Sequence, residues 1–226
     1  MIITIDGPAL SGKSTLGRAL ANELGYYYLY SGILFRAIAY LLQTQAGYNA
    51  QTIADVEQVD IAQFLDPKRF EYRYDPHIGE QVFFDGIDIT DQLKTPDVDA
   101  LASIIATNSV VRDALKDLQK RIAEHKDVVV DGRDSGSVVF PHAEYKFYIT
   151  ASAQERARRM QGALNKKGKS ITIDEAREQV AVRDARDMQR AIAPLIKPEG
   201  AIEVDTTGLQ KHETMESILE LLKGGG

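Results

Sequence analysis

The first 45 residues show two alternating patterns of apolar positions. Residues 2–6 are rich in β-branched side chains, which is typical of a buried parallel strand, and residues 26–30 predict a second short strand. Apolar side chains at helical spacing predict helices over residues 13–24 and 33–44. Strands and helices that alternate in this way indicate a parallel sheet with helical crossovers.

A different pattern begins past the second predicted helix. Residues 70–74 alternate between apolar and polar side chains with a period of two, and residues 81–84 do so roughly. Asp85 and Gly86 form a turn signal before residues 87–89. We therefore expect short antiparallel strands in a small insert.

The second half of the chain returns to longer elements. Its pattern predicts helices over residues 97–124, 152–164, 174–190 and 211–222, and strands over residues 128–131, 145–149 and 201–205. Together with the first two strands, these strands make five core strands. The sequence therefore predicts an α/β fold with a five-stranded parallel sheet flanked by helices.

Composition and charge exclude several classes of protein. The net charge of −6 argues against a general nucleic-acid binder, which usually carries a basic excess. No apolar run approaches the roughly 18 residues that span a bilayer, and the chain opens directly on a strand. We therefore expect neither a membrane segment nor a secretory signal. The absence of cysteine excludes disulfides and thiolate metal sites and is compatible with a cytoplasmic location.

The strongest chemical signal is the loop between the first strand and the first helix. Residues 7–14 read GPALSGKS, a full match to the P-loop pattern GxxxxGK[ST], with a strand before it and a helix after it. Backbone N–H groups of such a loop bind phosphate at a helix N-terminus. Lys13 is placed to reach the β- and γ-phosphates of ATP, and the Ser14 hydroxyl is placed to bind Mg²⁺. The alternative is a chance glycine loop, and the flanking elements argue against it.

A second candidate is the segment DGRD, which begins at Asp131 directly after the apolar residues 128–130. A carboxylate at the carboxyl end of a core strand is where a P-loop enzyme places a metal-facing acid. Taken alone, the segment also fits an ordinary turn, because Asp-Gly is common in turns. The P-loop motif elsewhere in the chain favours the first interpretation.

Arginines gather on two predicted helices. Arg183, Asp187 and Arg190 stand at i, i+4 and i+7 and share one face, and Arg156 and Arg159 lie on the preceding helix. Both groups also fit a solvated, salt-bridged surface. An excess of arginine suits phosphoryl transfer between two nucleotides, because bringing two polyanions together requires several cations. An acceptor phosphate needs no general base, so we assign the four histidines to the surface.

Together these stretches resemble the bacterial cytidylate kinase family. The resemblance runs over nearly the whole chain, from Ile3 to about Leu209. The stretches that carry it are the P-loop, YLYSGILFR at 28–36, DGRDSGSVVFP at 131–141, TASAQERARR at 150–159 and RDARDMQRAIAPL at 183–195. The stretches at 28–36 and 183–195 are specific to this family among P-loop kinases.

The resemblance implies a domain organisation and a reaction. It implies a P-loop core of residues 1–45 and 97–226, a monophosphate-binding insert at 46–96 and a lid at about 156–172. The lid would contain a mobile basic loop at 166–169. The implied reaction transfers the γ-phosphoryl group of ATP to CMP, and also to dCMP, giving ADP and CDP, with Mg²⁺ as cofactor. The implied protein is a cytoplasmic monomer without a nucleic-acid polymer or a membrane as partner.

The resemblance also assigns roles to individual side chains. The catalytic cations would be Lys13, Arg133, Arg156, Arg159 and Arg190, of which Arg156 and Arg159 belong to the lid. ATP would be bound by Gly7, Pro8, Ala9, Leu10, Ser11, Gly12, Lys13, Ser14 and Thr15, with Ser14 as the metal ligand. CMP would be bound by Ser31, Phe35, Arg36, Ser103, Arg112, Asp131, Arg133, Asp134, Arg183, Asp187 and Arg190.

Within the CMP set, the implied roles differ. Arg36, Arg133 and Arg190 would grip the phosphate. Arg183 and Asp187 would contact the sugar, with Ser31 nearby. Ser103, Arg112 and Asp134 would read cytosine, which offers an amino donor to a carboxylate and two acceptors to an arginine and a serine.

The chain departs from the family pattern at two positions. The family usually has glycine where this chain has Leu10, and glycine permits dihedral angles that leucine resists. The family usually has aspartate where this chain has Tyr30. Tyr30 therefore either changes the dependence on Mg²⁺ or packs against the first helix.

Three alternatives stay open. A kinase for UMP or another small acceptor would use the same loop. A GTPase-like switch is disfavoured, because the only Asn-Lys pair, Asn165-Lys166, is not followed by the aspartate that reads guanine. A catalytically impaired nucleotide-binding regulator is indicated only by Leu10 and Tyr30.

Overall fold

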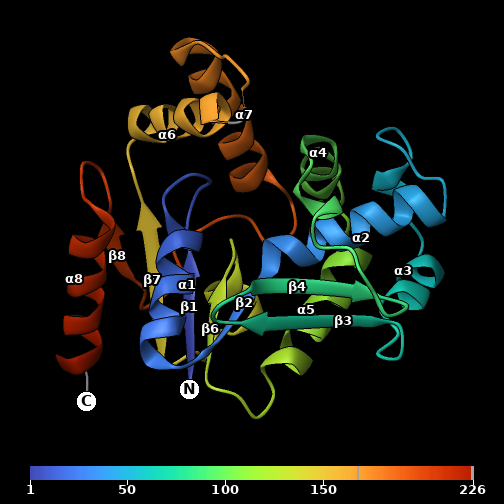
Figure 1. The fold of residues 1–226 in the computed structure, drawn as a ribbon, viewed down its shortest axis with the longest axis horizontal. Helices are drawn as coiled ribbons and strands as arrows, with labels where there is room; N and C mark the ends of the chain where they lie inside the picture. Colours follow the sequence, from blue (N-terminus) through green and yellow to red (C-terminus); the bar gives the residue numbers. More distant parts are fainter. Residues whose placement is uncertain (167, 225–226) are drawn as a thin grey trace. The chain divides into compact units, whose positions relative to one another are not determined.

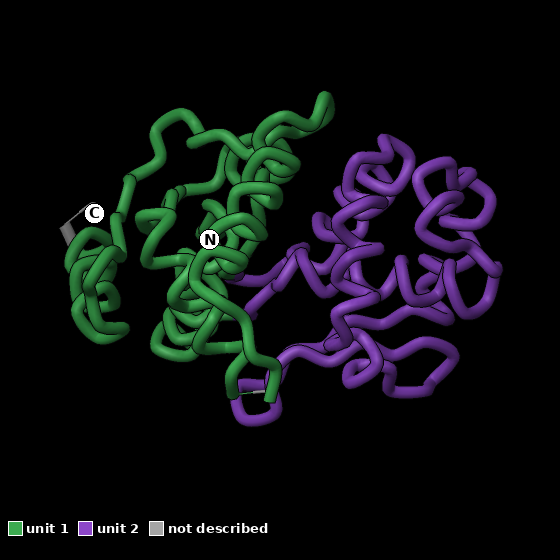
Figure 2. The backbone as a smooth tube through the Cα atoms, turned by 90° about the horizontal axis from the view of Figure 1, so that it is seen from above, with its two compact units in different colours: residues 1–26, 129–226 green, residues 27–128 purple. Residues whose placement is uncertain are grey.

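The computed structural model describes residues 1–166 and 168–224, and it divides into two compact units (Figure 2). The first unit contains residues 1–26 and 129–226, and the second contains residues 27–128. Lys167, which belongs to the expected mobile basic loop, lies outside the described residues.

The first unit alternates strands and helices (Figure 1). Its elements are β1 (Ile2–Asp6), α1 (Lys13–Leu24), β6 (Val128–Asp131, which begins at the boundary between the units), a π-helical turn η3 (Ser135–Val139), β7 (Tyr145–Thr150), α6 (Ala153–Lys166), α7 (Ile173–Gln189), β8 (Ile202–Asp205) and α8 (Lys211–Gly224). The predicted elements agree with these bounds to within two residues, except for the turn η3, which the sequence pattern does not predict.

The central sheet has five strands in the order β2-β6-β1-β7-β8, so the predicted five-stranded parallel sheet is confirmed. β1 pairs in parallel with β7, with Ile3 opposite Tyr145, and β7 pairs in parallel with β8, with Phe147 opposite Ile202. Parallel strands place their carboxyl ends at one edge of a sheet. In the first unit, the loops after β1, β7 and β8 therefore leave the sheet at the same edge.

The second unit holds the antiparallel strands. Its elements are β2 (Tyr27–Tyr30), α2 (Ser31–Gln45), the 3₁₀ turn η1 (Ile53–Asp55), α3 (Gln58–Phe64), β3 (Phe70–Asp75), β4 (Gly79–Phe84), β5 (Ile87–Asp88), the 3₁₀ turn η2 (Gln92–Lys94), α4 (Pro96–Ile105) and α5 (Ser109–Ala123). Strands β3, β4 and β5 form the small antiparallel sheet that the sequence predicts. Asp85 and Gly86 make its predicted turn with φ angles of 50° and 78°, as a tight hairpin turn requires.

One stretch of predicted helical periodicity is divided in the structure. The helical pattern over residues 97–124 is two helices, α4 and α5. Asn108 separates them, because its side-chain oxygen accepts a hydrogen bond of 3.1 Å from the backbone N–H of Val111 and caps the N-terminus of α5. The side-chain amide of Asn108 also donates to the carbonyl oxygen of Ala54 at 2.9 Å. An apolar period alone does not reveal a break that one polar cap produces.

Tyr72 of β3 ties the small sheet to β2. Its hydroxyl donates to the carbonyl oxygen of Tyr28 at 2.9 Å and accepts from the backbone N–H of Tyr30 at 3.1 Å. The hydroxyl of Tyr27 donates in turn to the carbonyl oxygen of Tyr72 at 3.2 Å. Two of these bonds are to backbone groups of β2, and the third is to the backbone of β3. The small sheet therefore holds the strand that leads directly into Ser31.

No helix among the described residues combines the length and the apolar character that a membrane crossing requires.

Candidate active site

The P-loop lies between β1 and α1, as the motif predicts. Gly7 and Gly12 have φ angles of 143° and 97°, which favour glycine. A Cβ atom on Gly7 would lie only 2.0 Å from the backbone oxygen of Ile149 in β7. The loop therefore starts against the neighbouring strand, at a point where no side chain fits.

Leu10 also has a left-handed backbone, with a φ angle of 64°. Its carbonyl oxygen accepts a hydrogen bond of 3.2 Å from Nη1 of Arg159. A left-handed conformation costs a residue with a Cβ atom about 1–2 kcal/mol. The leucine thus adopts a conformation that glycine adopts without strain.

Two substitutions of Leu10 test this strain. We expect Leu10→Ile to lower the free energy of unfolding by about 1–2 kcal/mol, because a β-branched residue resists the left-handed region more strongly than leucine does. Leu10→Gly should leave it unchanged to within about 1 kcal/mol, since relief of strain offsets the greater freedom of the unfolded chain. Urea unfolding of the three proteins measures both values. An isoleucine variant as stable as the natural protein would contradict the argument.

Lys13 is the buried cation of the loop. Its side chain is 4% exposed, and Nζ donates to the carbonyl oxygen of Pro8 at 2.9 Å. Burial, and after it the positive charge of Arg133, lowers the pKa of Lys13 to about 7, while the charges of Asp131 and Asp6 act in the opposite direction. The P-loop lysine therefore shares one electrostatic environment with the carboxyl groups at the ends of β1 and β6.

Asp6 is a residue of this site that the sequence analysis did not single out. Its two carboxylate oxygens accept hydrogen bonds from the backbone N–H groups of Ser135 and Gly136 at 2.8 and 2.7 Å. Burial nevertheless raises the pKa of Asp6 to about 6. Asp6 thus joins the end of β1 to the loop that carries Arg133 and Asp134. Its position at a strand end, directly before the P-loop, was the signal that could have found it.

Four predicted CMP-binding residues of the first unit form two ion pairs. Nε of Arg133 lies 2.9 Å from a carboxylate oxygen of Asp187, and Nη2 of Arg190 lies 3.3 Å from Oδ1 of Asp134. The second pair is the more buried one, with side-chain exposures of 5% and 11%. Each arginine predicted to grip phosphate in this unit is therefore held beside a carboxylate.

The two arginines predicted to belong to a lid both reach the P-loop. Nη1 of Arg156 lies 3.4 Å from the carbonyl oxygen of Ala9, and Arg159 donates to the carbonyl of Leu10 as described above. Arg156 also forms an ion pair with Asp184 of α7, at 2.6 Å. Asp184 is a second residue that the sequence analysis did not single out.

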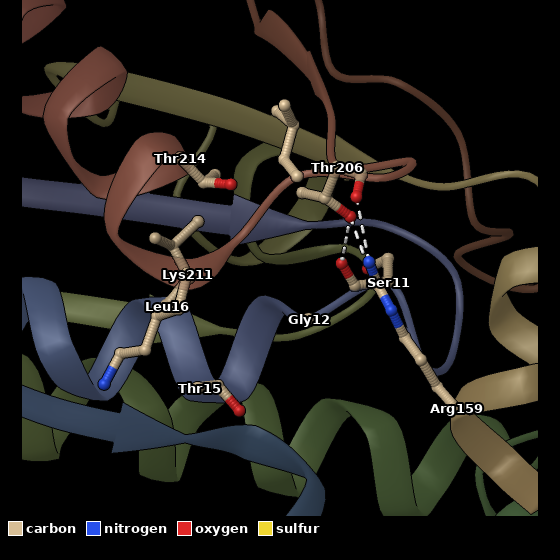
Figure 3. Close-up of a pocket in the computed structure, with 9 residues that line it drawn as sticks. Ser11, Gly12, Thr15, Leu16, Arg159, Thr206, Lys211 and Thr214 are labelled. Carbon is tan, nitrogen blue, oxygen red and sulfur yellow. Dashed lines mark hydrogen bonds between the residues drawn. The ribbon is translucent and has the colours of Figure 1, made fainter. Parts of the chain in front are cut away.

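A pocket of about 240 Å³ opens beside the P-loop in the first unit (Figure 3). Its lining residues are Ser11, Gly12, Thr15, Leu16, Arg159, Thr206, Leu209, Lys211 and Thr214. Thr206 forms hydrogen bonds to two other lining residues. Its hydroxyl donates to the carbonyl oxygen of Ser11 at 2.8 Å and accepts from Nη1 of Arg159 at 3.0 Å. Within the described residues, the buried hydroxyl of Ser11 has no hydrogen-bond partner. The pocket thus combines apolar walls with polar groups that a bound molecule could use.

The predicted acceptor residues of the second unit form two groups. Arg36 of α2 makes an ion pair of 2.6 Å with Asp99 of α4. The guanidinium carbon of Arg112 lies 5.5 Å from the ring centre of Phe35, and its Nη1 donates to the carbonyl oxygen of Ala106 at 3.0 Å. Ser31 is buried at the start of α2, and Ser103 is half-buried on α4.

Tyr30 lies among side chains of the second unit. Its ring stacks on Tyr28 with a centroid distance of 6.5 Å and an interplanar angle of 13°, and the guanidinium of Arg36 lies 5.9 Å from its centre. A Cβ atom on Gly32 would lie 2.8 Å from three atoms of the Tyr30 side chain. This arrangement supports a packing role for Tyr30 within the second unit.

Metal-ligating side chains do not cluster in the described part of the chain. No cluster of three or more His, Cys, Asp or Glu residues there could hold a metal ion. Mg²⁺ is usually held by substrate phosphates and only one or two protein oxygens, so a metal that enters with a nucleotide needs no such cluster. The half-buried Ser14 follows Lys13 at the start of α1 and fits that limited role. All four histidines are exposed, as predicted.

The chain is similar to proteins of known families. The family model described as Cytidylate kinase matches residues 3–224. A cytidylate kinase of Desulfitobacterium hafniense (strain Y51) is 40% identical over 219 residues, which cover 97% of this chain and 91% of that protein. A cytidylate kinase of Caldanaerobacter subterraneus subsp. tengcongensis is 38% identical over 221 residues, covering 98% and 94%. Among solved structures, an uncharacterized protein from Eubacterium ventriosum has a TM-score of 0.52 at 10% identity, covers 99% of this chain and 98% of its own, and shows likeness of fold alone.

Proposed function

Because this chain belongs to the cytidylate kinase family and is a nucleoside monophosphate kinase, we propose that it transfers the γ-phosphoryl group of ATP to CMP and also to dCMP. The products are ADP and CDP, or dCDP. The observation that carries the choice of donor is the pocket that continues from the P-loop to Thr206 and Lys211. We assign this pocket to the adenine and ribose of ATP, and we assign the loop to its phosphates.

The chemistry of the first unit supports the assignment of the donor. The Ser11 hydroxyl and the first turn of α1 offer hydrogen-bond donors to phosphate oxygens. Lys13 is buried in the loop, where a charge that develops on the transferring phosphoryl group would be stabilised strongly. Mg²⁺ would enter with ATP, with the Ser14 hydroxyl as its protein ligand, and would neutralise charge between the β- and γ-phosphates. The acceptor phosphate is already a nucleophile, so catalysis rests on positioning and charge.

We assign CMP-binding residues in each of the two units. In the first unit, Arg133 and Arg190 would bind the CMP phosphate, Asp134 the cytosine, and Arg183 and Asp187 the sugar. In the second unit, Arg36 would bind the phosphate, and Ser103 and Arg112 the cytosine. Asp131 is fully buried at the end of β6 and would act through its charge near Lys13.

A coupled assay of ADP release tests the proposed reaction. CMP, dCMP, UMP, AMP and GMP are supplied in turn with ATP and Mg²⁺, and we expect CMP and dCMP to give the highest kcat/KM. Higher activity on UMP would assign the chain to the alternative acceptor. Absence of ADP release with every acceptor, in a folded protein that binds ATP, would favour the impaired regulator. Light scattering and cell fractionation test the proposed monomeric state and cytoplasmic location.

The proposed reading of cytosine by Asp134 gives a specific prediction. Uracil presents a carbonyl where cytosine presents an amino group, and such a buried mismatch costs roughly 1–3 kcal/mol. Asp134→Ala should therefore lower the ratio of kcat/KM for CMP over UMP by roughly 5- to 150-fold. Loss of the ion pair with Arg190 affects both substrates alike, so the ratio isolates the base. An unchanged ratio would show that Asp134 does not read cytosine.

A further inference from the structure

Arg156 of α6 lies against the P-loop and makes four hydrogen bonds, two of them to one carboxylate. Nη1 and Nη2 donate to the two oxygens of Asp184 at 2.8 and 2.6 Å, and Nε donates to the carbonyl oxygen of Ala151 at 3.0 Å. Nη1 also contacts the carbonyl oxygen of Ala9 in the loop. The side chains of Arg156 and Asp184 are only 7% and 17% exposed. Arg156 and Asp184 therefore form a buried bidentate ion pair, and the arginine also contacts the phosphate-binding loop.

The neighbouring arginine is arranged differently. Arg159 meets its carboxylate partner, Glu155, through Nε alone, at 3.1 Å. Its two terminal nitrogens donate instead to the carbonyl of Leu10 and to the hydroxyl and carbonyl oxygens of Thr206. A carboxylate therefore occupies the planar fork of Arg156 but not the fork of Arg159.

The two terminal N–H donors of Arg156 that hold the carboxylate of Asp184 are the donors that a phosphate group would use. Two parallel N–H donors of a guanidinium bind two oxygens of either anion with the same geometry. A phosphate held by these same two parallel donors must therefore replace Asp184. Both anions cannot hold the same pair of donors.

We propose that Asp184 is a positioning residue that occupies the fork of Arg156 until a phosphate of the donor nucleotide replaces it. This inference rests on the proposed binding of ATP at the P-loop. Asp184 compensates the buried charge of Arg156 when the nucleotide is absent, because a buried cation without a partner is strongly destabilising. The same carboxylate competes with ATP, because the pair must be broken before a phosphate can take its place.

The competition gives Asp184→Asn two opposite effects. The variant should melt at a lower temperature than the natural protein without nucleotide, because Arg156 has lost its compensating charge. It should bind ATP roughly 5- to 20-fold more tightly, since a weaker neutral acceptor now competes with the phosphate. A residue that merely supports the fold would lower both the stability and the affinity.

The experiment measures the dissociation constant of ATP by isothermal titration calorimetry without acceptor, together with melting temperatures with and without ATP. Glu155→Gln is the matched control: it neutralises a carboxylate on the helix of Arg156 that contacts an arginine through Nε alone, and the affinity should not change. Asp184→Asn combined with Arg156→Met should lose the gain in affinity. If Asp184→Asn does not fold, Asp184→Ser replaces it, because a short neutral side chain cannot hold both terminal nitrogens of Arg156 and should also raise the affinity.

The outcomes separate this inference from the proposed function. If the natural protein does not phosphorylate CMP with ATP in the coupled assay, the proposed function is wrong. If it does, and the Asp184 variants bind ATP equally or more weakly than the natural protein, the role of Asp184 as a competitor is overturned.

Discussion

Lys13→Met is expected to remove at least 99% of turnover while it makes the protein more stable. The loss of turnover follows from the loss of a preorganised positive charge at the transferring phosphoryl group, which contributes on the order of 10²-fold or more. The gain in stability follows from burial. The lysine has a pKa of about 7 in the folded chain against 10.5 for an exposed lysine. Folding at pH 7 therefore disfavours its protonated form, which lowers the free energy of unfolding. Methionine has a similar length and no charge to bury.

The gain in stability should depend on pH in a defined direction. Below pH 7, both the folded and the unfolded chain carry a protonated Lys13, and the full cost of burying the charge is present. Between pH 7 and 10.5, the folded chain holds fewer protons than the unfolded chain, so the natural protein gains stability as pH rises. The advantage of Lys13→Met should therefore be about 1–3 kcal/mol at pH 6–7 and should fade toward pH 10.

Urea unfolding at pH 6, 7 and 9 measures this advantage, and the coupled assay measures turnover. Lys211→Met is the matched control for stability, because Lys211 is exposed at the rim of the same pocket and should give no gain. Normal turnover in Lys13→Met would refute the P-loop assignment. A variant less stable than the natural protein at pH 6 would refute the argument from burial.

Gly7→Ala should have the largest effect on folding. The added methyl group would lie 2.0 Å from the carbonyl oxygen of Ile149, which belongs to a paired central strand and cannot move away easily. The φ angle of 143° adds strain. Overpacking and backbone strain each cost about 1–3 kcal/mol, so we expect a loss of roughly 3–5 kcal/mol. A loss of that size is a large part of the stability of an ordinary domain.

Gly25→Ala separates the two causes. Gly25 ends α1 with a φ angle of 69°, and a Cβ atom there would meet nothing within 4 Å. Its substitution therefore tests backbone strain without a clash, and we expect a loss of about 1 kcal/mol. Circular dichroism during urea unfolding compares both variants with the natural protein. Equal losses for Gly7→Ala and Gly25→Ala would show that the close approach of Ile149 is unimportant.

The P-loop was predictable because its signal is local. Residues 7–14 specify the loop, and the flanking strand and helix can be read from adjacent residues, so the bounds of β1 and α1 agree with the prediction. The break between α4 and α5 was not predictable from periodicity, since apolar residues keep their spacing on both sides of Asn108. What divides the pattern there is one side-chain hydrogen bond, to the backbone of Val111.

The pocket and the charge pairs were harder to predict, because they join distant parts of the chain. Thr206 meets Ser11 across 195 positions of sequence, and Asp184 meets Arg156 across 28. The segment after β8 lies at the ligand-binding edge of a parallel sheet, and that rule alone could have pointed to Thr206. No local pattern separates Asp184 from the charged residues of an ordinary solvated helix.

Tyr30 and Gly32 form one steric unit. The ring of Tyr30 occupies the volume into which any side chain at position 32 would project, and three of its atoms lie 2.8 Å from that point. The two positions are therefore coupled: a side chain at 32 would force the outer end of the Tyr30 ring to move, whereas a small residue at 30 would leave that space open. Replacement of Tyr30 by a short side chain opens space beside the backbone of α2. The two positions are best exchanged together when this segment is redesigned.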